Sequence, residues 1–235
     1  MAQAFTGTSG FDYVEWKPGF YPGDLPRKRF LSYYANRFRA VELNNTFYRI
    51  PNSARIAAWS AATPDGFRFS LKAPRRITHF ERLKTPSSAL DQFIKVAAEL
   101  GPRLGALLFQ LPPYLKCDGE RLSLLLASVP LGLPIAFEFR HESWFRGDVY
   151  RTLERAGAAL CIHDADEGTT PEVITSHFAY VRLRRSGYTA ELRREWLEKI
   201  RSWTGGGTDV YVFIKHEDNP DAPLIATAFD EELAV

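Results

Sequence analysis

Short apolar runs recur along the whole chain, and the stretches between them space their apolar residues three or four apart. The short runs are rich in β-branched and aromatic residues, which is typical of β-strands. Eight such runs are found, at residues 4–10, 40–47, 67–73, 105–112, 134–141, 158–165, 178–185 and 209–217. The pattern therefore predicts a regular alternation of strands with other elements.

The stretches between the strands predict amphipathic helices. Leu90, Phe93 and Ala97 share one helical face, and Leu153 and Ala156 show the same spacing further along. The stretch at residues 165–177 has the weakest helical pattern. One shortened or irregular unit is therefore predicted there.

Eight strands alternating with helices over 235 residues predict an α/β fold, a single TIM-type (β/α)8 barrel domain covering residues 1–235. The alternative is an open, doubly wound sheet, which usually has fewer strands. A sheet of that kind would favour a glycine-rich phosphate fingerprint after its first strand, and this chain has none there.

The direction of each side chain follows from the alternation along a barrel strand, which sends one residue outward to the helices and the next inward. In "PIAFEFRH" the bulky Phe137 and Phe139 are expected outside, so Glu138 and Arg140 point inside. The same rule places a further set inside, namely Glu42, Asn44, Ser70, Lys72, Leu108, Gln110, Cys161, His163, Tyr180, Arg182, Arg184, Tyr211, Phe213 and Lys215. A polar interior is therefore predicted throughout the barrel.

Most of the polar inward residues lie near the carboxyl ends of their strands, where barrel enzymes build their active sites. Only Glu42 and Glu138 are acidic. The basic members are Lys72, Arg140, Arg182, Arg184 and Lys215. This excess of positive charge predicts an anionic ligand, and a phosphorylated one suits the loops after strands seven and eight.

The first strand ends in "GTSGF", where Gly7 and Gly10 would let backbone amides approach a ligand and Thr8 or Ser9 would supply a hydroxyl group. The predicted ligand-binding residues are Thr8, Ser9, Asn44, Gln110, Arg140, Arg182, Arg184 and Lys215.

The candidate catalytic residues are Glu42, Lys72, Glu138 and His163. A carboxylate pair could serve glycoside hydrolysis, but neighbouring cations would hold both ionised and so oppose a proton-donating acid. A lysine among cations suits a general base or a Schiff base, in aldol or isomerase chemistry. The reaction class therefore stays open between a hydrolase and a lyase or isomerase.

No cofactor is predicted. Glu42, Glu138 and His163 could together hold a divalent metal ion in a barrel, but no HxH or HExxH motif supports such a site. The two cysteines, Cys117 and Cys161, have neither a disulfide framework nor a metal-binding spacing and are expected to be free thiols.

The overall charge is nearly balanced, with 30 basic and 28 acidic residues. A net charge of +2 gives no general field for nucleic acid, so a nucleic-acid partner is not favoured. The chain shows neither a signal peptide nor an apolar run long enough for a membrane span, so a cytoplasmic location is expected. Nothing in the sequence indicates an oligomeric state.

Several long segments resemble the DUF72 or YecE-like family, among them "VELNNTFYR", "FRFSLKAP", "LGALLFQLPP" and "FEFRHESW". The resemblance covers nearly the whole chain and implies a TIM-type barrel of unassigned function. Many members have tryptophan where this chain has Phe11.

Three functions remain in competition. The leading one is an enzyme acting on an anionic or phosphorylated small molecule at the carboxyl-end mouth of the barrel. The second is a non-catalytic module for a metabolite or for single-stranded nucleic acid, held by loop aromatics with Arg75, Arg76 and Arg82. The third is a structural barrel whose inward charges satisfy one another in an ion-pair network.

Overall fold

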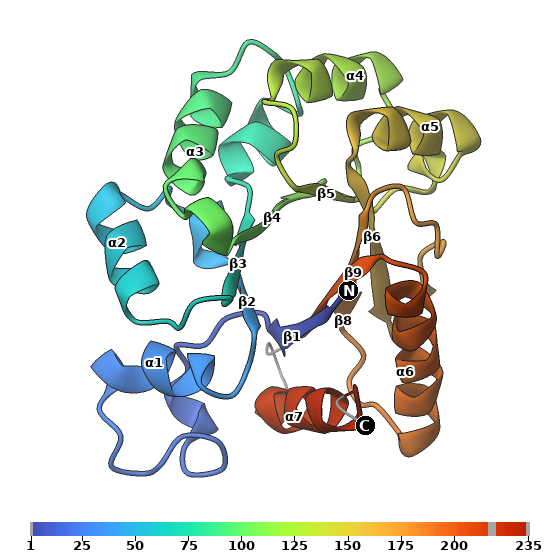
Figure 1. Cartoon of the computed structure of the whole chain (residues 1–235). Coiled ribbons are helices and arrows are strands. Elements are labelled where there is room, and N and C mark those ends of the chain that lie inside the picture. Colours follow the sequence, from blue (N-terminus) through green and yellow to red (C-terminus); the bar gives the residue numbers. More distant parts are fainter. Residues whose placement is uncertain (1, 216–219, 234–235) are drawn as a thin grey trace.

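The computed structural model describes residues 2–215 and 220–233. Eight parallel strands form its frame, in the spatial order β1-β9-β8-β6-β5-β4-β3-β2. Their bounds are β1 Ala4–Thr8, β2 Ala40–Leu43, β3 Arg68–Lys72, β4 Leu104–Gln110, β5 Ile135–Glu138, β6 Ala159–Ala165, β8 Phe178–Leu183 and β9 Asp209–Ile214. Figure 1 shows these strands as a ring with helices outside it. The TIM-type barrel is confirmed, although residues 216 and 217 of the last predicted strand lie outside the described residues.

Seven α-helices surround the ring within the described part of the chain. They are α1 Phe30–Ala35, α2 Ser53–Ala61, α3 Ser88–Ala98, α4 Gly119–Ser128, α5 Gly147–Ala156, α6 Ala190–Gly205 and α7 Ala222–Leu233. Short helical turns add η1 Val14–Trp16, η2 Arg27–Arg29, η3 Asn45–Phe47, η4 Arg76–Phe80, η5 Gly101–Arg103 and η6 Glu142–Trp144. Four helices begin where a side chain caps the first turn, from Asn52, Ser87, Asp118 and Thr189.

The connection between β6 and β8 differs from the others. It contains the two-residue strand β7 (Gly168–Thr169), which pairs antiparallel with β6, and no helix occurs among residues 166–177. The irregular unit predicted from the weak apolar spacing is confirmed.

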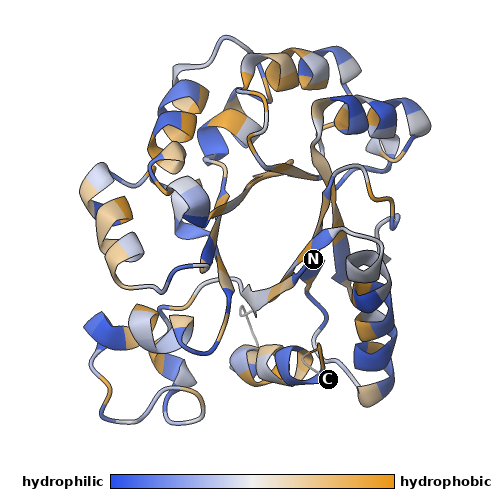
Figure 2. Cartoon of the chain, in the orientation of Figure 1, coloured by the Kyte–Doolittle hydropathy of each residue, from blue (hydrophilic) through white to orange (hydrophobic). Residues whose placement is uncertain are grey.

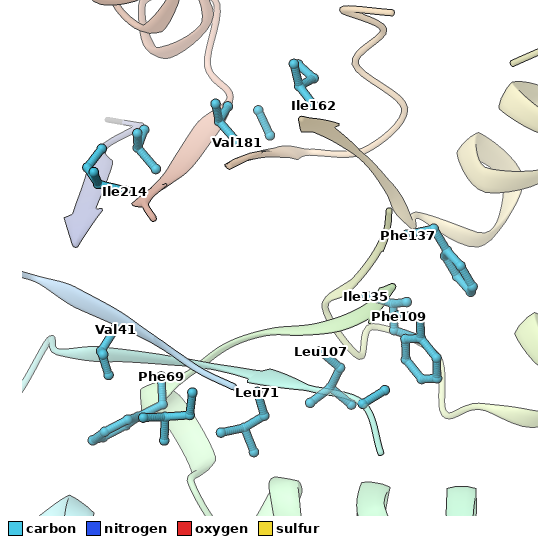
Figure 3. Close-up of a cluster of buried hydrophobic side chains, with 14 of the residues drawn as sticks. Val41, Phe69, Leu71, Leu107, Phe109, Ile135, Phe137, Ile162, Val181 and Ile214 are labelled. Atoms are coloured by element: carbon cyan, nitrogen blue, oxygen red, sulfur yellow. The ribbon is translucent and has the colours of Figure 1, made fainter. Parts of the chain in front are cut away.

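The main core lies between the strands and the helices. Figure 3 shows a group of its side chains, among them Val41, Phe69 and Phe137, around the strands that bear them. Figure 2 shows hydrophobic colouring along most of the ring and mixed colouring on the helices. The outward direction predicted for the bulky strand residues is confirmed.

A second buried cluster fills the inside of the barrel, and it corrects one prediction. Its members are Phe5, Ala40, Ala106, Leu108, Ala136, Ala159, Cys161, Phe178, Tyr180, Tyr211 and Phe213. The prediction of a polar interior throughout was therefore wrong, because the deeper inward positions have no access to water and are filled by apolar and aromatic side chains.

The seam between β1 and β2 is closed in an unusual way. Among the described residues its ladder is reduced to one isolated bridge, between Ser9 and Glu42. The Tyr34 hydroxyl from α1 accepts a hydrogen bond from the Thr8 amide at 2.8 Å and donates to the Ala40 carbonyl at 3.0 Å. A tyrosine hydroxyl thus stands where a backbone rung would be.

Gly7 makes this close approach feasible. A Cβ atom at that position would lie 2.0 Å from the Ala40 carbonyl oxygen and 2.9 Å from the Tyr34 hydroxyl. Any larger residue would force the two strands apart.

Candidate functional site at the carboxyl-end mouth

Arg182, on β8, lies at the centre of the inward charges. One terminal nitrogen contacts Glu42 Oε1 at 2.7 Å, and the other donates to Glu138 Oε2. The two carboxylates are 0% exposed and Arg182 is 1% exposed. The inward direction predicted for these three residues is confirmed, and together they form what we call the Arg182 network.

Further donors complete both carboxylates. Glu42 accepts hydrogen bonds from the Ser9 hydroxyl and the Tyr180 hydroxyl, each at 2.8 Å. Glu138 accepts from Gln110 Nε2 at 2.9 Å and from the Arg140 guanidinium. Each buried carboxylate therefore receives donors from three different side chains, which is what makes such burial tolerable.

The same contacts fix the charge state of the carboxylates. Burial alone would raise the pKa of Glu42, but the adjacent Arg182 guanidinium outweighs it and the pKa is lowered. The pKa of Glu138 is lowered further, because Arg140 acts on it together with Arg182. Both groups are ionised at neutral pH.

Lys72 ends β3 and belongs to the same mouth, but it is bound differently. Its ammonium nitrogen lies 4.3 Å from the centre of the Phe47 ring, and among the described residues it makes no ion pair. Partial burial and the charge of Arg182 lower the pKa of Lys72 to about 8. About a tenth of the amine is therefore neutral at pH 7.

His163, on β6, is 7% exposed. No described residue forms a hydrogen bond to its ring nitrogens; only its backbone is bound, to Thr170. Burial lowers the pKa of His163 to about 4, with Arg140 and Arg182 opposing the attraction of Glu138. The imidazole is neutral at physiological pH, so one of its nitrogens carries a proton and the other can accept one.

The remaining predicted cations surround this mouth. The charge of Arg184 acts on the pKa of Lys72 and of His163, which places Arg184 close to both. Lys215 follows β9, is partly buried and donates its amide to the Leu183 carbonyl. The side chain of Arg140 is 31% exposed and forms the outer edge of the paired group.

Two predicted ligand-binding residues, Thr8 and Asn44, form no hydrogen bond with the Arg182 network. Thr8 donates its hydroxyl to the Gly10 carbonyl at 2.6 Å and contacts the Tyr34 hydroxyl at 2.9 Å, so it serves the seam. Asn44 follows the end of β2 in helical conformation, where strand alternation no longer applies. It lines a cavity of about 210 Å³ with Gly10 and Trp59, and its buried amide oxygen has no partner in the described residues.

Sequence reasoning left two hydroxyl groups out of the site. Tyr180 was placed inside the barrel but given no role, although it shares a strand face with Arg182, and Tyr34 was given no role. Among the aromatic residues in the segments after β2, β5 and β8, Trp144 is 0% and Tyr188 8% exposed, so both pack inside the protein, whereas Tyr48 is 73% exposed.

A metal site at Glu42, Glu138 and His163 finds no support in the geometry. The described part of the chain contains no group of three histidine, cysteine, aspartate or glutamate side chains that could hold a metal ion. The carboxylates direct their oxygens at Arg182 instead. Cys117 and Cys161 are free thiols, as predicted, and no described helix is long and apolar enough to cross a membrane.

Comparisons with known proteins agree with this architecture. The family described as "Protein of unknown function DUF72" matches residues 5–235. YecE of Escherichia coli strain K12 is 28% identical over 232 residues, covering 86% of this chain and 85% of YecE. YunF of Bacillus subtilis is 31% identical over 169 residues, covering 66% of this chain and 60% of YunF.

Solved structures give the same result. A DUF72 family protein from Thermotoga maritima, TM1631, superposes with a TM-score of 0.88 at 29% identity, covering 99% of this chain and all of that one. A DUF72 family protein from Enterococcus faecalis, EF0366, has a TM-score of 0.79 at 21% identity, covering 100% of this chain and 99% of its own, and supports the fold.

Proposed function

The chain belongs to the DUF72 family, whose function is unknown, and we propose from its own geometry that the barrel mouth is the active site of an enzyme for small anionic carbonyl compounds. We infer an anionic substrate because the mouth carries more cationic side chains than its two carboxylates, Glu42 and Glu138, can neutralise. Lys72 is the residue on which the proposal rests.

Lys72 combines three properties that a structural lysine does not need. It lies at the carboxyl end of a barrel strand, it has no ion-pair partner in the described residues, and its pKa is lowered to about 8. A neutral amine in such a position can attack a carbonyl carbon or remove a proton beside one. This is the chemistry of lyases and isomerases.

The carboxylates have a supporting role in this proposal. Glu42 and Glu138 are held ionised by Arg182, so neither supplies the protonated acid that glycoside hydrolysis requires. They fix Arg182 and Arg140, and the neutral His163 imidazole is the group that exchanges a proton with the substrate.

A barrel filled only by its own side chains accounts for less of the geometry. It explains why Glu42, Glu138 and Arg182 satisfy one another. It gives no reason for Lys72 and His163, whose polar atoms have no hydrogen-bonding partner in the described residues.

The first test is thermal denaturation with pairs of carbonyl compounds that differ only in a phosphate or carboxylate group. A ligand at 100 times its Kd adds about 2.7 kcal/mol, which raises the Tm by roughly 5–10 °C for a domain of this size. We expect shifts only with the anionic member of a pair, and none in Lys72→Met. Equal behaviour of charged and uncharged members would refute the proposal.

The second test detects the amine step directly. Attack of neutral Lys72 on the carbonyl carbon expels water and forms an imine, which borohydride reduces to a stable secondary amine. Mass spectrometry should then find a gain equal to the compound minus one oxygen atom, on the peptide containing Lys72. Lys72→Arg keeps the charge but cannot form the imine, so labelling in that variant would disprove the assignment.

A further inference from the structure

The loops beside the mouth carry an exposed aromatic surface. Tyr48, Phe80 and Tyr114 are 73%, 68% and 60% exposed, and they are the only aromatic residues among the large hydrophobic residues that the described chain exposes. They come from the loops after β2, β3 and β4, which are adjacent strands. We call these three residues the loop aromatics.

Each loop aromatic has an arginine near its ring. The Arg75 guanidinium lies 5.9 Å from the Tyr48 ring and 5.4 Å from the Phe80 ring, and Arg82 lies 5.6 Å from the Tyr114 ring. Tyr48, Arg75 and Phe80 line one cavity of about 340 Å³. The rings and guanidinium groups therefore form two clusters on three adjacent loops, Arg75 with Tyr48 and Phe80, and Arg82 with Tyr114.

The backbone of the middle loop holds these clusters in place. Arg82 and Leu83 have φ values of 50° and 63°, a left-handed conformation that side chains larger than glycine rarely adopt. Leu83 is buried while Arg82 is exposed. The strained turn thus anchors the loop through Leu83 and presents Arg82 to solvent, as is common at binding sites.

The charge along this loop is positive. Residues 72–84 contain five basic side chains and one acidic one, Glu81, which is paired with Arg76 at 2.8 Å. Arg75 and Arg82 form no ion pair with any described residue. The balanced net charge of the chain averages this patch away, which is why composition argued against nucleic acid.

We infer that the loop aromatics, with Arg75 and Arg82, form a binding surface for single-stranded nucleic acid. Exposed rings stack on unpaired bases of any sequence, and the arginines between them contact the backbone phosphates. The surface lies beside the mouth but shares no residue with the Lys72 chemistry. A negative result for either proposal therefore leaves the other unaffected.

Other partners fit the surface less well. A membrane anchor needs a continuous apolar face, but the exposed aliphatic residues Val14, Leu124, Leu131 and Leu224 lie outside these three loops. Duplex nucleic acid keeps its bases stacked on one another and offers the rings no free face. An acidic protein would use the arginines and leave the three rings without a role.

Fluorescence anisotropy with labelled 12-nucleotide DNA and RNA strands tests the inference on the full chain. We expect binding to both strands and weaker binding to a duplex of the same length. Each phosphate contact should contribute about −0.7 to the slope of log K against log salt. Changing Arg75→Gln and Arg82→Gln together should therefore flatten the slope by about 1.4.

The aromatic contribution needs its own variants. The triple change Tyr48→Ala, Phe80→Ala and Tyr114→Ala should weaken binding at least tenfold without changing the salt slope. The matched control is Leu124→Ala, Leu131→Ala and Leu224→Ala, which removes exposed apolar residues elsewhere and should bind as wild type. Unchanged Tm values check folding in both.

Three results would overturn the inference. They are wild-type affinity in the aromatic triple variant, tighter binding of the duplex than of the single strand, and equal binding of a polyanion without aromatic rings, such as polyphosphate. The last result would reduce the surface to a general anion patch without a role for the rings.

Discussion

The barrel mouth holds two groups of inward residues that are bound in opposite ways. The Arg182 network, from β2, β5 and β8, consists of Glu42, Glu138 and Arg182, which are buried and bound by several partners. The second group, from β3 and β6, consists of Lys72 and His163, which have lowered pKa values and no hydrogen-bonding partner in the described residues. The first group resembles a folded core, and the second contains the residues that we propose act on the substrate.

This difference separates charges that maintain structure from charges available for chemistry. A buried ion pair whose carboxylates and terminal guanidinium nitrogens bind one another has little left to offer a substrate. A buried cation without a partner costs stability, and proteins retain such costs mainly at functional sites. Substitutions of Arg182 and of Lys72 should therefore change the free energy of unfolding in opposite directions.

The largest effect on stability is expected in the Arg182 network. Arg182→Met would leave two ionised carboxylates buried without their main partner, and such a loss costs about 3–5 kcal/mol. Urea denaturation at pH 7 measures it. The triple variant Glu42→Gln, Glu138→Gln and Arg182→Met should recover much of the loss. A single variant as stable as wild type would show that the network does not hold the barrel together.

Lys72→Met should have the opposite sign and stabilise the ligand-free protein at pH 7. The folded pKa of about 8 lies below the reference value of 10.5, so the charged lysine opposes folding at pH values below 8. We expect a gain of about 1–2 kcal/mol, allowing for partial exposure. The gain should shrink between pH 8 and 10, as the folded protein sheds the charge. A loss of stability at pH 7 would contradict the comparison.

His163→Gln should change how stability depends on acid. The unfolded chain takes up a proton near pH 6.5, whereas folded His163 stays neutral down to about pH 4, so wild type loses stability as pH falls through that window. The variant should lose about 1 kcal/mol less than wild type between pH 7 and 5. Parallel curves for the two proteins would mean that His163 is accessible to protons in the folded state.

The smallest effect is expected at Arg140, at the outer edge of the Arg182 network. The Arg140 guanidinium donates a hydrogen bond to Glu138, but the Arg140 side chain is 31% exposed. Arg140→Ala should therefore cost less than about 1 kcal/mol in urea denaturation. A cost comparable to that of Arg182→Met would show that Arg140 contributes as much stability as the buried members of the Arg182 network.

Much of this arrangement could be predicted from the sequence. Charged residues that alternate with phenylalanine, as Glu138 does with Phe137 and Phe139, can only face the inside when the helices cover the outside. The eight strands and the irregular unit at residues 165–177 followed from hydrophobic spacing alone.

The pairing of the charges could not be predicted in the same way. Which carboxylate meets Arg182 depends on the tilt and register of strands that are distant in the sequence, and alternation carries no such information. The direction of Asn44 does not follow from strand alternation, because β2 ends at Leu43 and not at residue 47. The apolar depth of the barrel was missed because the same alternation applies at both ends of a strand, whereas only one end reaches water.

The bridge between Ser9 and Glu42 has a consequence for motion. Among the described residues it is the one backbone bridge recorded between the β1 and β2 segments. The Ser9 hydroxyl also donates a hydrogen bond to the Glu42 carboxylate, which belongs to the Arg182 network. Barrel closure and assembly of the Arg182 network therefore depend on the same pair of residues. We expect local opening of β1 and of the network to occur together. Amide hydrogen exchange in β1 should then slow when an anion occupies the mouth, which would make the first strand a natural reporter of occupancy.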